Sequence, residues 1–326
     1  MRYLSLPSTD PHYNMAFDEF ALQGLDLEEP VFYLWQNRPS VIIGLNQSPY
    51  AEVNLPFLEE RGIVLARRVT GGGAVYHDLQ NLNYTITGRA RDLQAAYPEY
   101  LHLVIDALRQ LGVAAQLSGR NDILVDGRKC SGFAKRLWKD RLMVHGTLMY
   151  DVDIDTLTRA LAVPGSKLAA AGIASVRSRV ANLRAYLPAF SGIDSFRAAL
   201  QGILSDGDSE ILLTAAQKAA VARDADTRFR TWQWNFGRSP RADFRLRRRL
   251  PCGTVEAAFS LPHGRIHDLR FGGDFLGNLP AEAMETLLEG CPYTEEALAA
   301  ALSGVDTRTY FDGLETAALI GFLLGR

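Results

Sequence analysis

Two arginines precede a run of three glycines, and this combination suits the binding of an anion. Arg67 and Arg68 are followed by glycines at positions 71–73, shortly after the apolar run 63–66. Consecutive glycines add no packing and lose much entropy on folding, so they suit backbone that bends sharply or approaches another group closely. Guanidinium groups beside exposed backbone N–H groups favour carboxylate or phosphate oxygens. The stretch predicts an anion site, with a plain tight hairpin as the alternative.

Lys129 is the best single candidate for chemistry. Asp126 and Gly127, between two short runs of strand-forming residues, are typical of a two-residue hairpin turn, so Lys129 is expected on a strand with a fixed direction. Its ammonium group would neutralise a phosphate or polarise a carboxylate in a transition state, whereas the alternative is a solvated lysine. Asn121 and Asp122, at the far end of the hairpin, offer oxygens for a ribose, an amide or a magnesium ion.

Composition limits the class of protein. The 326 residues include 47% hydrophobic residues, enough for one large core and a smaller one, and the net charge of -2 lacks the basic excess of a dedicated nucleic-acid binder. The N-terminus has no signal-peptide core, and the longest apolar run, 317–324, is far shorter than the roughly 20 residues of a membrane span. Cys130, Cys252 and Cys291 form no C-x-x-C pair. We therefore expect a soluble, cytoplasmic protein without a disulfide framework.

Several common catalytic motifs are missing from the sequence. It contains no P-loop, no early G-x-G-x-x-G, no H-E-x-x-H and no G-x-S-x-G. His77 and His145 are not at metal-ligand spacing, so each is expected to be a hydrogen-bonded strand residue. The basic cluster at 245–249 is either a solvated linker or strand edge, or a contact for an acidic partner.

The elements that must position these residues are expected to form an α+β fold. Residues 31–35, 40–44, 63–66, 84–87 and 145–151 have the composition of strands, and 97–111 has the periodicity of a helix closed by Gly112. A further helix is expected from Met15 to Leu25 with Asn14 as its N-cap. A composition break near 232–240 divides the chain into a larger unit, 1–238, and a smaller one, 239–326, in which strands at 253–261 and 265–271 join three helices.

The chain resembles lipoate-protein ligases in stretches that occur in the family's order. They are residues 66–78 with Asn81, then 119–122, 128–132, 145–148, 168–170, 175–180 and 234–237. The match covers nearly the whole chain, and the small unit resembles the C-terminal accessory domain of two-domain ligases. The resemblance implies a biotin/lipoate ligase-like fold of mixed β-sheets with flanking helices, and a small α+β C-terminal domain.

The resemblance also implies a two-step reaction. Lipoate and ATP, with Mg²⁺, would give lipoyl-AMP and pyrophosphate, and the lipoyl group would pass to a lysine of a lipoyl carrier domain, either an E2 subunit of a 2-oxoacid dehydrogenase or the glycine cleavage H protein. No membrane or nucleic-acid partner is expected. Bringing two anions together requires that their repulsion be offset by an arginine, a lysine and a row of amides.

The resemblance assigns roles to individual residues. Lys129 is the expected catalytic residue. The expected ATP and lipoyl-AMP contacts are Arg68, Gly73, Ala74, Val75, Tyr76, Asn121, Asp122 and Lys129, and the expected lipoate contacts are Arg68, Gly72, Gly73, His77, Lys129 and His145. The adenylate-binding loop comprises Ser175, Val176, Arg177, Ser178, Arg179 and Val180. Asp122 is the candidate magnesium ligand.

Two other functions are considered. An octanoyltransferase of the same fold uses a cysteine nucleophile, but the two loops that carry it in those relatives here read Ser-Gly-Arg at 118–120 and Ala-Val-Pro-Gly at 162–165. Cys130 adjoins Lys129 on the strand and is expected to face the core. A non-catalytic module that binds nucleic acid through 245–249 is disfavoured by the near-neutral charge.

Overall fold

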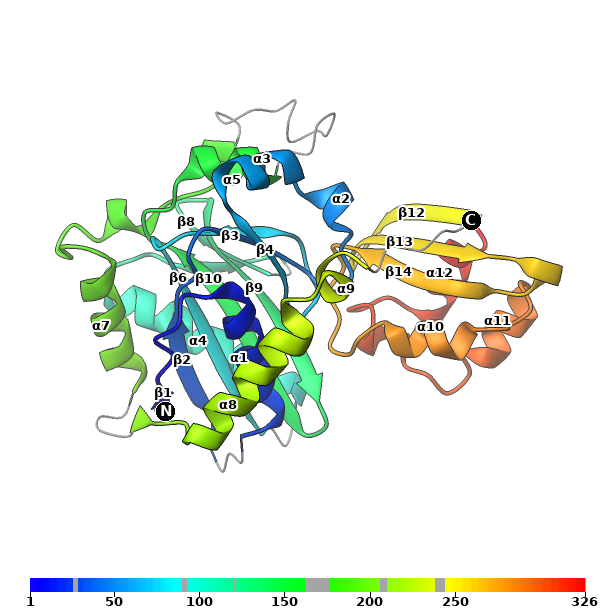
Figure 1. Cartoon of the computed structure of the whole chain (residues 1–326), viewed down its shortest axis with the longest axis horizontal. Helices are drawn as coiled ribbons and strands as arrows, with labels where there is room; N and C mark the ends of the chain where they lie inside the picture. The colour runs from blue at the N-terminus through cyan, green and yellow to red at the C-terminus, as the bar shows by residue number, and fades with distance from the viewer. Residues whose placement is uncertain are drawn as a thin grey trace.

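The protein was analysed as a computed structural model. The structure describes residues 1–25, 29–89, 93–119, 121–161, 176–205, 210–237 and 244–325. Within these ranges, no helix has the length and apolar character required to cross a membrane. The described chain forms a large N-terminal unit and a small C-terminal unit, with the two chain ends on different units (Figure 1).

An eight-stranded sheet is the centre of the large unit. Its order is β11-β1-β2-β6-β10-β9-β8-β7, antiparallel except where β1 pairs with β2 and β11. The strands are β1 (Arg2–Leu4), β2 (Val31–Trp35), β6 (Asn81–Arg89), β7 (Gln116–Ser118), β8 (Asp122–Val125), β9 (Arg128–Trp138), β10 (Arg141–Met149) and β11 (Glu210–Ile211).

Helices bury both faces of this sheet. Phe32 and Leu34 of β2 belong to the core beneath α4 (Leu93–Gln110) and α7 (Ile193–Leu204), whereas Tyr33 and Trp35 belong to the core beneath α1 (Pro11–Gln23) and α8 (Ala215–Asp224). Successive strand side chains point to opposite faces, so a strand covered on both sides reads as one apolar run. A π-helical turn (Ala225–Phe229) and the short α9 (Trp232–Asn235) end the large unit.

A second, three-stranded sheet carries the glycine loop. Strand β3 (Ser40–Ile43) pairs in parallel with β4 (Val64–Arg67) and antiparallel with β5 (Val75–His77). Helices α2 (Pro49–Glu52), α3 (Leu55–Arg61) and α5 (Ile154–Leu161) lie beside it (Figure 1). The 3₁₀ turn Leu183–Tyr186 packs through Leu183 on the core of the large sheet. The glycines at 71–73 connect β4 to β5, so the loop starts from two buried strands.

The C-terminal unit is a three-stranded antiparallel sheet packed against helices. Its strands are β12 (Phe244–Leu250), β13 (Gly253–Ser260) and β14 (His267–Gly273), and its helices are α10 (Glu282–Leu288), α11 (Glu295–Ala301) and α12 (Thr316–Leu323), with 3₁₀ turns at Pro262–Gly264 and Thr307–Thr309. β13 alternates buried and half-buried residues, as expected of a sheet with one covered face. Figure 1 shows the helices on one side of this sheet.

The expected fold class is confirmed, with one local correction. The first helix begins at Pro11, not at Met15, because Asp10 is the N-cap and accepts a hydrogen bond from the His12 N–H group. Of the structural alternatives considered for the basic cluster at 245–249, the strand edge is confirmed, since the cluster lies within β12, an edge strand. The predicted boundary between residues 238 and 239 lies outside the described residues.

Candidate active site

A cavity of about 250 Å³ lies where the two sheets of the large unit and the C-terminal unit meet. Most residues predicted for the site line it: Arg68, Gly72, Gly73, Ala74, Val75, His77, Asn121, Asp122, Lys129 and His145. Trp35, Ile42 and Phe133 add apolar surface. A concave site that combines apolar surface with convergent polar and charged groups suits a ligand with an apolar tail and a charged head.

The hairpin of β8 and β9 holds Lys129 as expected. Asp126 and Gly127 both adopt positive φ, 49° and 71°, which is the backbone of a type I′ turn. Lys129 Nζ lies 2.8 Å from Asp122 Oδ1 across the hairpin. A Cβ on Gly132 would lie 3.0 Å from Lys129 Nζ, so this glycine makes room for the ammonium group. The lysine is therefore directed along the strand pair into the cavity.

Arg68 is buried, and its guanidinium group holds the glycine loop. Nη2 donates to the carbonyls of Gly71 (2.7 Å) and Gly73 (2.8 Å), and Nη1 donates to the carbonyl of Ile42 at 3.1 Å. Burial lowers the pKa of Arg68 to about 10, which leaves it charged at neutral pH. Its positive charge lies under the loop, and its hydrogen bonds set the shape of the loop.

Arg67 has a different role from its neighbour. It is 1% exposed, and Nη1 donates to the carbonyls of Gly44, Leu45 and Gln47, while Nε and Nη2 donate to those of Trp234 and Asn235. Trp234 Nε1 donates in return to the Arg67 carbonyl at 3.0 Å. Arg67 thus fastens the loop after β3 to α9, and the Trp234 side chain adds to this connection.

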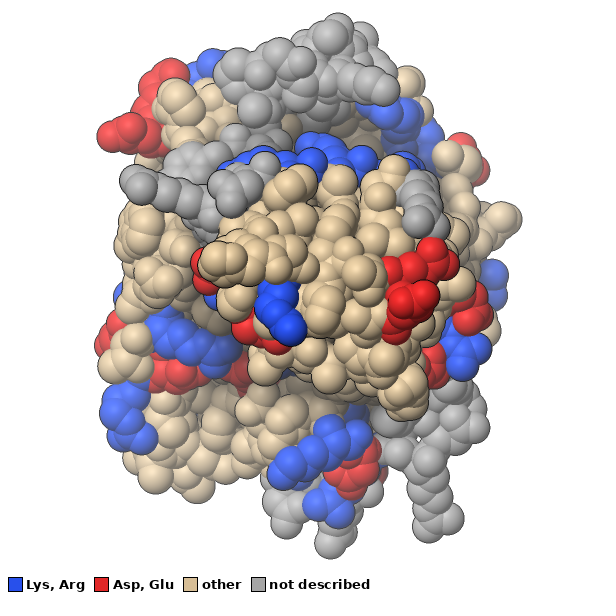
Figure 2. Space-filling model, turned by 90° about the vertical axis from the view of Figure 1, so that its right-hand side faces the viewer, with Lys and Arg blue, Asp and Glu red and all other residues tan. Residues whose placement is uncertain are grey.

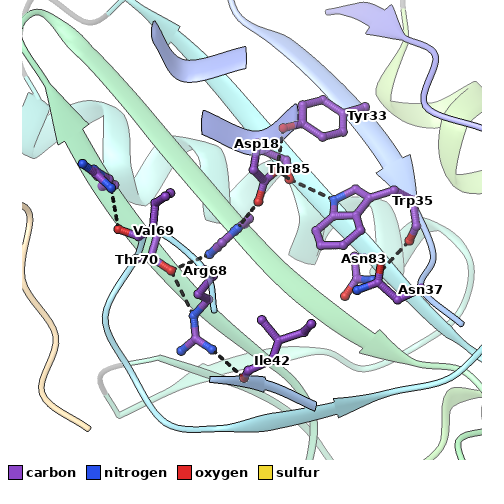
Figure 3. Close-up of polar contacts among 12 residues, drawn as sticks. Asp18, Tyr33, Trp35, Asn37, Ile42, Arg68, Val69, Thr70, Asn83 and Thr85 are labelled. Carbon is purple, nitrogen blue, oxygen red and sulfur yellow. Dashed lines mark hydrogen bonds and ion pairs between the residues drawn. The ribbon is translucent and has the colours of Figure 1, made fainter. Parts of the chain in front are cut away.

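A buried hydrogen-bond network beneath the cavity was not predicted (Figure 3). His145 Nδ1 lies 2.6 Å from Asp18 Oδ2, and His145 Nε2 lies 2.7 Å from Thr70 Oγ1, which accepts from Arg68 Nε at 3.0 Å. Because a carboxylate only accepts, His145 Nδ1 is the donor to Asp18. Tyr33 also donates to Asp18 at 2.5 Å. The network connects helix α1 to the base of the glycine loop.

His77 lies in the same region and is neutral. Asn37 Nδ2 lies 3.1 Å from His77 Nδ1, and the Trp35 ring meets the imidazole edge-on at 6.0 Å. Burial, then the charges of Arg68 and His145, lowers the pKa of His77 to about 3. An imidazole of this kind can form hydrogen bonds to a ligand without carrying charge.

The described part of the predicted adenylate-binding loop, 176–180, does not line the cavity but contacts Lys129. The Lys129 N–H donates to the Arg179 carbonyl, and the Ala181 N–H donates to the Lys129 carbonyl, both at 2.8 Å. Val180 forms a parallel bridge with Lys129. Val176 is buried, and Arg177 pairs with Asp155 at 2.7 Å. Ser175 lies outside the described residues.

Two further predicted residues differ in where they point. The side chain of Tyr76 lies in the core formed with α3 and α5 and does not line the cavity, so its expected contact is limited to backbone. Cys130 is fully buried on the face opposite Lys129, as expected, and burial raises the pKa of its thiol to about 12. A thiol in that state is a poor nucleophile.

Sequence reasoning missed the part of the cavity built by the C-terminal unit. Arg249, Asp274 and Leu276 line it, and the Gly72 N–H donates to the Phe275 carbonyl at 3.1 Å. A Cβ on Gly71 would lie 2.6 Å from the Phe275 carbonyl oxygen, so this glycine permits the close approach. No local signal marks these residues, because the contact joins positions about two hundred residues apart.

Comparison with known proteins agrees with this geometry. The lipoyl protein ligase A/B catalytic domain family matches residues 10–204, and the bacterial lipoate protein ligase C-terminus family matches residues 239–323. A lipoate-protein ligase of Bacillus subtilis, LplJ, is 40% identical over 94% of both chains. Lipoate-protein ligase 1 of Staphylococcus aureus is 37% identical over 96% of both.

Solved structures agree with the sequence comparison. P. falciparum LipL1 in complex with lipoate shares the fold over 100% of this chain and 99% of its own, with a TM-score of 0.82 at 22% identity. A bipartite lipoate protein ligase of Thermoplasma acidophilum, described with its E2 lipoyl domain, covers 74% of this chain and 98% of its own (TM-score 0.67, 29% identity). A lipoate-protein ligase A bound with ATP covers 72% and 98% (TM-score 0.63, 29% identity). The chain belongs to the lipoate-protein ligase family.

Proposed function

We propose that this protein activates lipoate with ATP and transfers the lipoyl group to a lysine of a lipoyl carrier domain. The lipoate carboxylate attacks the α-phosphorus of ATP, the bond to the β-phosphate breaks, and lipoyl-AMP and pyrophosphate form. The amine of the carrier lysine then attacks the lipoyl carbonyl, and AMP leaves. The observation that carries this proposal is that Arg68 and Lys129 reach one cavity, since two negatively charged reactants must meet there.

Lys129 is proposed to contact both the lipoate carboxylate and the α-phosphate. Its ammonium group, 2.8 Å from Asp122, is proposed to offset the charge that develops during attack. The backbone at 73–76 and Asn121 are proposed to contact the nucleotide, and Gly72, His77 and His145 the lipoyl group. Residues 175–180 are proposed as the adenylate-binding loop, since their described part is bonded to the Lys129 backbone.

Magnesium is proposed to accompany ATP. Mg²⁺ is commonly held by one or two carboxylates together with substrate phosphates, and two carboxylates, Asp122 and Asp274, line the cavity. Asp122 is the proposed ligand. Its pairing with Lys129 means that it would share its oxygens between the ammonium group and the metal. The ion would supply charge neutralisation at the phosphates.

E2 subunits and the H protein are the proposed carriers, and the cytoplasm is the proposed compartment. We also propose that residues 1–238 and 239–326 are the catalytic and accessory domains. Figure 2 shows basic and acidic side chains intermixed on the face of the molecule formed by the C-terminal unit, which suits a protein partner better than a nucleic acid.

The test is mass spectrometry of a lipoyl domain incubated with the protein, lipoate, ATP and magnesium. A mass gain of one lipoyl group that requires ATP supports the proposal. Modification without ATP, from an octanoylated carrier, would instead support the octanoyltransferase. Replacing Cys130 by Ala separates the two chemistries, because the ligase keeps its activity and a cysteine-dependent transferase loses it.

A further inference from the structure

The C-terminal unit contributes a positively charged side chain, Arg249, to the cavity. It lies near the end of β12, opposite Thr254 of β13, and lines the cavity together with Asp274. Its Nη1 donates to Thr254 Oγ1 and to Asp274 Oδ2, both at 3.1 Å. Among the residues that the structure describes, its hydrogen bonds are all made by Nη1, and 65% of the side chain is exposed. The Nε and Nη2 groups are therefore available to a ligand.

Asp274, which binds Arg249, places this arginine next to the glycine loop. Asp274 Oδ1 accepts from the Thr254 N–H at 2.5 Å, which fixes the carboxylate that holds Arg249. A Cβ on Gly73 would lie 4.0 Å from Asp274 Cβ, and one on Gly72 would lie 3.3 Å from Leu276 Cδ2. The C-terminal unit thus contacts the glycine loop directly, and Arg249 lies at the edge of this contact.

The charges already in the cavity leave a place for this arginine. Arg68 directs its hydrogen bonds to loop carbonyls, and Lys129 pairs with Asp122 at 2.8 Å. A nucleoside triphosphate carries about four negative charges, and planar guanidinium groups bind phosphate oxygens in pairs. An exposed ion pair contributes little, so Arg249 can exchange Asp274 for a phosphate at small cost.

We propose that Arg249 binds the β- and γ-phosphates of ATP during activation and stabilises the pyrophosphate as it leaves. This inference rests on the proposed function and assigns to the C-terminal unit a residue of the first half-reaction. Charge accumulates on the β-phosphate oxygen as its bond to the α-phosphorus breaks, and Arg249 neutralises it there. Its exposure suits the hydrated end of the nucleotide, whereas Trp35, Ile42 and Phe133 suit the apolar end of lipoate.

Arg247 provides a matched control. It lies two residues away on the same strand, is 64% exposed, and pairs with Glu256 at 2.9 Å. It lines a separate cavity on the other side of the junction, with Asn46 and Gln47. Arg247→Ala removes the same charge from the same strand without touching the proposed phosphate site.

The experiment measures the two half-reactions separately for the wild type, Arg249→Ala, Arg249→Lys and Arg247→Ala. The first readout is lipoate-dependent pyrophosphate release from ATP, together with the inhibition constant for added pyrophosphate. The second is transfer from synthetic lipoyl-AMP to a lipoyl domain. We expect Arg249→Ala to slow release at least tenfold and to weaken pyrophosphate inhibition, with transfer within twofold of wild type. Arg249→Lys should be intermediate and Arg247→Ala near wild type.

Other outcomes are equally clear. Normal release by Arg249→Ala overturns the inference, and so does an equal loss in both half-reactions, because that pattern means Arg249 only positions the two units. Loss of release with unchanged pyrophosphate inhibition also overturns it. If the wild type releases no pyrophosphate in response to lipoate, the proposed function itself fails, which is a distinct result.

Discussion

Among the described residues, two ion pairs line the cavity, and they differ in how rigidly the surrounding structure holds them. Lys129 and Asp122 belong to the large sheet, lie 2.8 Å apart, and are 37% and 35% exposed. The backbone of Lys129 is bonded on both sides by residues 179–181. Arg249 and Asp274 belong to the C-terminal unit, and Arg249 is 65% exposed on an edge strand. The first pair has a fixed direction, which suits its proposed place at the reaction centre, and the second can adjust, which suits its proposed contact with the phosphates.

Removing the fixed ammonium group should have the largest effect. Lys129→Ala is expected to lower lipoyl-AMP formation by about 100- to 1,000-fold, the usual loss when one aligned electrostatic group is removed. Pyrophosphate release measures it, with Lys139→Gln as a control on a lysine in the turn that directly follows the same strand. A Lys129→Ala protein that makes lipoyl-AMP at the native rate would remove Lys129 from the mechanism.

Removing the hydrogen bonds of Arg67 should lower the stability of the large unit. Arg67→Met would leave buried carbonyls of two segments, 44–47 and 234–235, without their donor, so we expect a loss of about 3 kcal/mol or more in the free energy of unfolding. Urea unfolding measures it. The control is Arg61→Met, an exposed arginine beside Glu60, expected to change stability by less than about 0.5 kcal/mol. A loss for Arg67→Met below about 1 kcal/mol would contradict the role of Arg67.

Acid should lower the stability of the folded protein, because unfolding allows His77 to bind a proton. Its folded pKa of about 3 lies below the ordinary value of 6.5, so between these pH values the unfolded chain binds a proton that the folded chain does not. Stability therefore falls as pH drops through this window, by about 2 kcal/mol between pH 7.5 and pH 5. His77→Gln should lose that part of the pH dependence. Replacing the exposed His102 by Gln should retain it, and equal slopes for both variants would disprove the assignment.

Disturbing the contact between the glycine loop and the C-terminal unit should give the smallest effect. Gly71→Ala would put a Cβ 2.6 Å from the Phe275 carbonyl and weaken the hydrogen bond from the Gly72 N–H, at a cost of about 1 kcal/mol. Hydrogen exchange at residues 71–73 should accelerate about fivefold. Gly321→Ala, in α12 with open space around it, should leave this exchange unchanged. Unchanged exchange in Gly71→Ala would show that the C-terminal unit does not protect the loop.

Much of the fold was predictable because the signals were local. The Asp126-Gly127 turn determined the direction of Lys129, and the strand predicted at 253–261 corresponds to β13. The residues of β12 stayed undecided between a linker and a strand edge, because arginines at 245 and 247–249 hide the alternation that identifies a strand. The first helix was begun too late, since Asp10 and Asn14 are both acceptable N-caps and Pro11 decides between them.

The site was predictable only in part. The arginine and glycine motif and the hairpin lysine are recognisable by residue type. Asp18 is not, since its contacts with His145 and Tyr33 depend on how α1 packs over the large sheet. Arg249 and Asp274 depend on how two separately formed units meet, and neither composition nor periodicity carries that information.

The hydrogen bonds that Arg67 donates to main-chain carbonyls have a consequence for sequence variation among related enzymes. The hydrogen bonds that Arg67 donates to residues 44, 45, 47, 234 and 235 all end on main-chain carbonyls, so none of them depends on the side chain of the residue that accepts it. A side chain such as that of Leu45 can therefore change without removing a partner of Arg67, and the loop after β3 stays joined to α9.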